Sequence, residues 1–218
     1  KDKTGFRPYM PQNGELTADL MGVPMLGKLP TLTLEELPNG MKVCGTQILG
    51  NADDPTVRQE YAKQLVGLIR GDNESCREQN RMGAIFHSTP AVHTNMNSLA
   101  LTDPSFQLYQ NSVKDRPSVL YTTTHDGQLH AFRVDRAEDV STSEYGEELW
   151  SYIPNFVLSR LNILSDRFDF ILDGIPTIRD VLLYKDDPAT PAEILKDRWR
   201  SILIVPGGFR TSGLIAMD

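Results

Sequence analysis

Short runs in which apolar and polar residues alternate recur along the chain from residue 84 onward. Alternation with a period of two is typical of strands that bury one face. Between two of these runs, the dipeptide Asp126-Gly127 predicts a tight hairpin turn. The runs predict four antiparallel strands over 84–94, 118–124, 128–134 and 147–153, and then three more over 171–184, 200–206 and 212–217.

The second group of strands repeats the first. Three landmarks recur 86, 83 and 85 positions apart: Pro90 and Pro176, Leu120 and Leu203, and Leu129 and Leu214. Offsets that stay nearly constant while the residues drift indicate a repeated structural unit. We therefore predict an all-β fold, an incomplete β-propeller with four-stranded antiparallel blades over about 84–153 and 171–218. The second blade lacks its fourth strand, and two insertions, 95–117 and 185–198, lengthen the repeat.

A helical pattern precedes the strands. Asp54 is a good N-cap, Pro55 suits the first helical position and Gly71 can end the helix, which predicts a helix over about 55–70. Its apolar stripe, expected to pack on a core, consists of Val57, Tyr61, Leu65, Leu68 and Ile69.

A second short helix is predicted over about 155–164, and its inward positions are expected to be Phe156, Leu158 and Leu161. Residues 1–52 are rich in Pro and Gly and are interpreted as an extended connecting segment. Residues 53–218 then form the first part of the propeller domain.

Charge and hydropathy narrow the class of protein. The 218 residues carry a net charge of −7, which argues against a nucleic-acid partner because phosphate binding needs clustered Lys and Arg. No apolar run approaches the ~20 residues of a membrane-spanning helix. The last residues, 214–218, have the pattern of a strand, and a strand there would leave an unpaired sheet edge. We therefore expect a fragment whose partner is the remainder of its own propeller beyond Asp218.

Two cysteines, Cys44 and Cys76, are too few for a disulfide scaffold. They can form one bridge or remain two separate buried thiols. Composition leaves both alternatives open, because the cellular compartment decides between them.

Several polar residues near the strands invite a catalytic hypothesis: His87, Ser88, His125, Asp126 and His130. A Ser-His-Asp triad needs a nucleophile on a strained elbow, and the chain contains no G-x-S-x-G motif. The alternative is that Asp126 bonds turn amides while His87 and His130 pair with buried polar groups. We favour these structural roles and assign no catalytic residue.

Other motifs carry little chemistry. The sequence holds no calcium loop, H-E-x-x-H motif or Cys/His pairing at zinc spacing, so no metal ligand or cofactor is assigned. Arg70-Gly71-Asp72 spells a receptor-recognition tripeptide, although Gly71 also suits the helix end. Trp150 and Trp199 are interpreted as packing residues between blades.

Seven segments taken in order resemble the PilC/PilY family of proteins associated with the tips of bacterial type IV pili. They are LVGLIRG (65–71), RMGAIFHSTP (81–90), DGQLHAF (126–132), GEELWSYIP (146–154), DGIPT (173–177), WRSILI (199–204) and GLIAMD (213–218). The resemblance covers about residues 55–218. It implies the C-terminal domain of such a protein, a modified propeller related to quinoprotein dehydrogenases.

The resemblance also implies a function. We expect a non-enzymatic protein of the periplasm, pilus tip or outer surface of a Gram-negative bacterium, which supports pilus assembly, twitching motility and adhesion. Its expected partners are minor pilins and host-cell or abiotic surfaces. That location favours a Cys44–Cys76 disulfide, and calcium, which some members bind, is expected only elsewhere in the full-length protein. Motif positions assigned to the fold are His87, Ser88, Pro90, Asp126, Gly127, Leu129, His130, Phe132, Trp150, Asp173, Gly174 and Pro176.

Two alternatives remain at this point. A quinone-cofactor dehydrogenase shares the propeller plan, but the adjacent cysteine pair typical of such enzymes is missing, because Cys44 and Cys76 lie far apart in the sequence. A generic protein-interaction propeller fits the strand pattern equally well, because fold does not dictate function.

Overall fold

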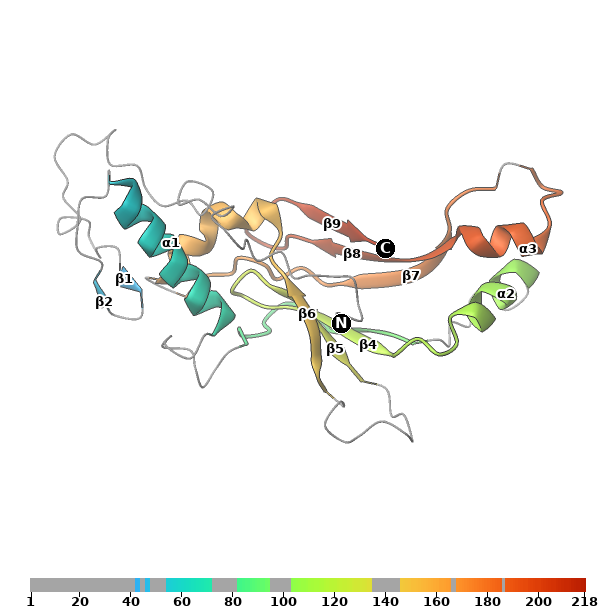
Figure 1. Ribbon diagram of the computed structural model, residues 1–218, viewed down its shortest axis with the longest axis horizontal. Helices are drawn as coiled ribbons and strands as arrows, with labels where there is room; N and C mark the ends of the chain where they lie inside the picture. The colour runs from blue at the N-terminus through green and yellow to red at the C-terminus, as the bar shows by residue number, and fades with distance from the viewer. Residues whose placement is uncertain are drawn as a thin grey trace.

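Two antiparallel sheets form most of the structure, a computed structural model that describes residues 42–43, 46–47, 54–71, 82–94, 103–134, 146–165, 168–185 and 187–218. The first sheet has the order β3-β4-β5-β6 and the second β7-β8-β9 (Figure 1). The first consists of β3 (Ala91–His93), β4 (Val119–Thr123), β5 (Leu129–Arg133) and β6 (Glu148–Tyr152). The second consists of β7 (Thr177–Leu182), β8 (Trp199–Pro206) and β9 (Leu214–Met217).

The two sheets share one register, so the repeat is structural. In the first sheet Val92 pairs with Leu120, and adding the offsets of 86 and 83 leads to the observed pair Ile178 and Leu203. Leu120 pairs with Phe132, and the offsets of 83 and 85 lead to the observed pair Leu203 and Met217. The sequence landmarks therefore identify equivalent positions of two similar sheets.

The first strand of each sheet is shorter than the pattern predicts. Instead of 84–94 and 171–184, β3 and β7 begin at Ala91 and Thr177. Each follows a proline, Pro90 or Pro176, and proline has no N–H to donate to a ladder. The predicted lengths were wrong because alternation continues through both prolines while the hydrogen bonding cannot.

Helix α1 (Pro55–Arg70) confirms its predicted ends. The Asp54 side chain accepts a hydrogen bond from the Thr56 amide, and Gly71 adopts a left-handed conformation with φ of 64°. The segment predicted as a short helix over 155–164 is the 3-10 helix η3 (Asn155–Ser165). The short strands β1 (Lys42–Val43) and β2 (Thr46–Gln47) pair antiparallel next to α1.

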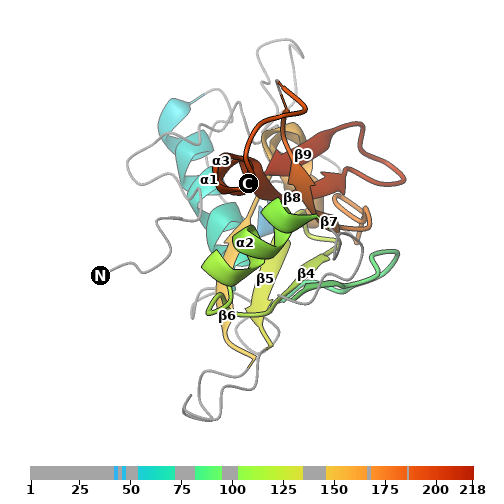
Figure 2. The same cartoon turned by 90° about the vertical axis from the view of Figure 1, so that its right-hand side faces the viewer.

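The insertions hold more helix than the sequence pattern indicates. Residues 95–117 contain α2 (Pro104–Ser112), and residues 185–198 contain α3 (Ala192–Leu195) and the 3-10 helix η4 (Lys196–Arg198). α2 and α3 pack together at one end of the sheets (Figure 2). The expectation of one or two short helices was therefore too low, although the described chain is still mainly sheet.

One apolar core joins both sheets to α1 and η3. It contains residues from all four parts, and of the α1 stripe Leu65, Leu68 and Ile69 are buried in it while Val57 packs at its margin. In η3, Leu161 and the unpredicted Val157 are fully buried, and Phe156 packs against the core. Among the described helices, none has the length and apolar character needed to cross a membrane.

The Asp126-Gly127 turn allows a test of the packing of the core against the β4–β5 hairpin. Gly127 has φ of 90°, and a Cβ there would lie 3.1 Å from side-chain atoms of both Ile171 and Leu161. Gly127→Ala should therefore combine backbone strain with overpacking and lower the free energy of unfolding by about 2–4 kcal/mol.

The matched control is Gly146→Ala. Gly146 has a similar φ of 81°, but a Cβ there would meet no atom within 4 Å. Gly146→Ala should lower the free energy of unfolding only through backbone strain, by about 1–2 kcal/mol. Urea denaturation of both variants measures the difference, and equal losses would show that the turn does not pack tightly on the core.

Candidate functional site

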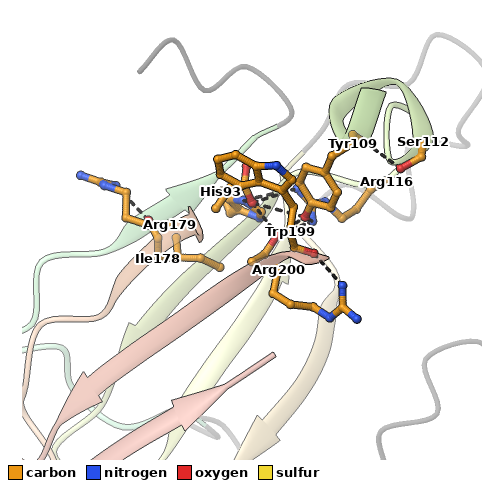
Figure 3. A network of polar contacts seen from close by, with 10 residues as sticks. His93, Tyr109, Ser112, Arg116, Ile178, Arg179, Trp199 and Arg200 are labelled. Atoms are coloured by element: carbon orange, nitrogen blue, oxygen red, sulfur yellow. Dashed lines mark hydrogen bonds and ion pairs between the residues drawn. The ribbon is translucent and has the colours of Figure 1, made fainter. Parts of the chain in front are cut away.

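A cleft of about 330 Å³ opens between the two sheets at the end that carries α2. Its walls come from both sheets, from Tyr109 of α2 and from the segment after α2. Figure 3 shows several of these residues and the polar contacts that join them. The lining residues include four large aromatic and two cationic side chains: Tyr109, Tyr121, Trp150, Trp199, Arg116 and Arg200.

A buried carboxylate, Asp180 of β7, organises the polar side of this cleft. Its side chain is 3% exposed, and its Oδ1 lies 3.3 Å from Nε2 of His93 in β3. The Ser201 hydroxyl in β8 donates to the same oxygen over 2.6 Å. The guanidinium of Arg116 lies 3.9 Å away. Asp180 thus joins the first strand of each sheet to the segment that follows α2.

The Asp180 carboxyl is held in its ionised form. Burial acts to raise its pKa, but hydrogen bonds from His93 and Ser201 and the charges of His93 and Arg116 outweigh this effect. The pKa therefore lies below its ordinary value.

The same network fixes α2 on the second sheet. Arg116 donates to the Ser201 hydroxyl over 2.6 Å, and the Tyr109 and Ser201 hydroxyls lie 2.9 Å apart. Trp199 donates its indole N–H to Ser105 over 3.0 Å and packs against Phe106 at a ring separation of 4.7 Å. Trp199, interpreted from sequence as packing between blades, instead packs on the helix of an insertion.

The side chains around Asp180 are not arranged as a Ser-His-Asp catalytic triad. In a triad the histidine lies between serine and aspartate and can take the hydroxyl proton. Here the Ser201 hydroxyl donates to Asp180, and His93 contacts that same carboxylate from another side. The arrangement therefore positions β3, β7 and α2, while the cleft beside it offers space for a ligand.

The candidate residues from the sequence lie at the other end of the strands and do not converge on one site. His87 Nδ1 lies 2.5 Å from Oδ2 of Asp173, a residue 86 positions later. The Ser88 hydroxyl accepts from the Thr123 amide over 3.1 Å, and His125 Nδ1 accepts from the Ala84 amide over 2.8 Å. Each side chain has its own structural partner.

Asp126 and His130 belong to a separate buried chain of contacts. The Thr124 hydroxyl donates to Asp126 over 2.5 Å and lies 3.1 Å from Nε2 of His130, whose Nδ1 lies 2.5 Å from Glu148. Thr124 and Asp126 are fully buried. These contacts stabilise the hairpin, and Glu148 at the end of the chain of contacts is 45% exposed.

Other motif residues serve the packing. Leu129 is fully buried in the core, Phe132 stacks with His130 and Trp150 packs against Tyr121. The Gly174 carbonyl accepts from the Thr123 hydroxyl over 2.9 Å, which is a further bond between the sheets. Gly71 of the Arg70-Gly71-Asp72 tripeptide is buried at the end of α1.

Some predictions fall on residues that the structure does not describe. They concern Cys44, Cys76, Asp72, most of 1–52, and the side chains of Tyr61, Arg70 and Leu158. The described ranges contain no cluster of three or more His, Cys, Asp or Glu residues that could hold a metal ion.

Four phenylalanine and two histidine rings form a second surface feature next to Asp173. They belong to Phe86, His87, His125, Phe168, Phe170 and Phe209, and we call them the aromatic surface. Phe86 and Phe170 lie 4.6 Å apart, and Phe168 and His125 are stacked at 4.3 Å.

Neither the cleft nor the aromatic surface was predicted. The pair Asp103-Pro104 has the same capping pattern as Asp54-Pro55 and could have indicated α2. The Asp180 contacts had no comparable signal, because they join residues from separate sheets.

Comparisons of the chain with protein-family models, curated proteins and solved structures find no match.

The Asp180 network predicts a pH dependence of stability. Because the folded-state pKa is lowered, the stabilisation is complete above the unfolded-state pKa of about 3.9 and is lost as pH falls toward the folded-state value. Asp180→Asn should lower the free energy of unfolding at pH 6 by about 1–3 kcal/mol and reduce its loss below pH 4.

Urea denaturation at a series of pH values measures this effect. The control is Asp115→Asn, which replaces an exposed carboxylate outside the network. If the two variants gave the same pH profile, Asp180 would not be an ionised anchor of the sheets.

Proposed function

We propose that this chain is part of a non-enzymatic recognition protein of the PilC/PilY type, which acts at type IV pilus tips through contacts with minor pilins. On this proposal the two sheets are successive blades of a β-propeller. The protein would support pilus assembly, twitching motility and surface adhesion from the periplasm or outer cell surface.

The observation that carries the proposal is the shared register of the two sheets. The offsets that relate the strands also relate the turns, since the Thr124–Gln128 backbone hydrogen bond matches that between Gly207 and Gly213. The inner strands β3 and β7 lie next to each other. Adjacent blades around a propeller axis would have this arrangement.

The polar residues also favour recognition over catalysis. His87, Ser88, Asp126, His130 and Asp173 each bond to a neighbouring strand, turn or loop. Such contacts stabilise a scaffold whose surface is available for partners, as is common for propellers.

The proposal predicts binding to minor pilins by the full-length protein. Purified ectodomains of each minor pilin from the same organism are immobilised, and the major pilin serves as the matched control. We expect micromolar or tighter binding to at least one minor pilin, in the range of specific protein contacts, and none to the major pilin.

Deletion of the gene should also remove surface pili and twitching. Normal piliation in the deletion strain would contradict the proposal. Oxidation of alcohols by the full-length protein supplied with a quinone cofactor and calcium would contradict it as well, because it would show a dehydrogenase.

A further inference from the structure

The aromatic surface exposes more apolar area than an isolated surface residue would. Phe86 is 60%, Phe168 57% and Phe209 79% exposed. Their rings belong to one connected group, because Phe86 and Phe168 both contact Phe170 while His87 lies between Phe86 and Phe209. Scattered exposed apolar residues are ordinary, but connected patches mark interaction sites.

Buried carboxylates hold these rings in place. Asp173 accepts the Phe209 amide over 2.9 Å and pairs with His87, so it fixes two of the contributing loops. Asp169, between Phe168 and Phe170, accepts the Phe170 amide over 2.8 Å and pairs with Arg160 and Arg210 at 3.1 Å each. The aromatic groups are therefore pre-ordered, which lowers the entropy that a partner would have to offset on binding.

Among the described residues of this surface, the exposed charged side chain is that of Arg210. The side chains of His87 and Arg210 are 50% and 53% exposed, whereas those of Asp173 and Asp169 are 2% and 6% exposed. The surface thus combines aromatic rings with one exposed cation, on a chain whose net charge is −7.

We propose that the aromatic surface binds a protein segment in which aliphatic or aromatic side chains are flanked by Asp or Glu. The apolar side chains pack on Phe86, Phe168 and Phe209, and the carboxylates contact the exposed guanidinium of Arg210. Exposed aromatic residues supply most of the binding energy in many protein interfaces, and complementary charge at the edge adds specificity. This inference is independent of the pilus proposal, because any acidic apolar partner would satisfy it.

Two synthetic fluorescent peptides of equal length test the proposal on the full-length protein. Both carry Leu and Phe at the same positions, and the positions between them are Glu in one peptide and Lys in the other. We expect the Glu peptide to bind at least about tenfold more tightly, as measured by fluorescence anisotropy, with an affinity that falls as salt rises. Equal affinities would overturn the choice of an acidic partner.

Substitutions locate the binding site. Phe209→Ala and Phe86→Ala should each weaken binding of the Glu peptide about tenfold. The matched control is Leu214→Ala, since Leu214 is 64% exposed but belongs to no contact of the aromatic surface. Circular dichroism checks that each variant is folded, and unchanged affinity in both folded Phe variants would contradict the proposal.

If something other than an acidic protein segment occupied the aromatic surface, one of three distinct experimental results would show it. Concentration-dependent self-association that is lost in Phe209→Ala would show that a second copy covers the surface. Binding to neutral phospholipid vesicles that is lost in Phe209→Ala would show a membrane contact. A cysteine introduced by Phe209→Cys that resists thiol labelling in the full-length protein would show that its own chain covers the surface. Each of these results would overturn the proposal.

Discussion

Two His–Asp contacts join the sheets along β3 and β7, one beside the aromatic surface and the other beside the cleft. His87 contacts Asp173 before these strands begin, and His93 contacts Asp180 within them. Both aspartates are almost fully buried, so removal of either histidine would leave a buried carboxylate with one partner fewer. The contacts therefore add directional links between the sheets to the apolar packing of the shared core.

The boundary between the two sheets, along β3 and β7, is a seam whose two ends differ in solvent exposure. At the Asp180 end, α2 covers the second sheet through Trp199, Tyr109 and Arg116, and the sheets part to leave the cleft. At the Asp173 end, loops meet and their aromatic rings remain outside. A His–Asp contact thus lies beside a cleft at one end and beside an exposed aromatic surface at the other.

Sequence patterns correctly predicted the helices and strands whose signals lie close together in the chain. Alternation located the strands of both sheets, and Asp54, Pro55 and Gly71 located α1 because capping uses residues close in sequence. Adding the constant offsets to a residue pair of the first sheet also gives the observed pair of the second sheet. α2 was missed because residues 95–117 show no sustained apolar period, although Asp103 caps its first turn.

The site could not be predicted in the same way. Asp180 meets His93 and Arg116 only because the sheets pack on each other, and sequence spacing does not encode which faces meet. The same holds for the aromatic surface, since Phe86 and Phe209 lie on loops of different sheets. The repeat still explains one contact, because His87 and Asp173 occupy equivalent positions. Two identical charged residues there would repel each other, so the divergence to histidine and aspartate is what permits a buried carboxylate at the seam.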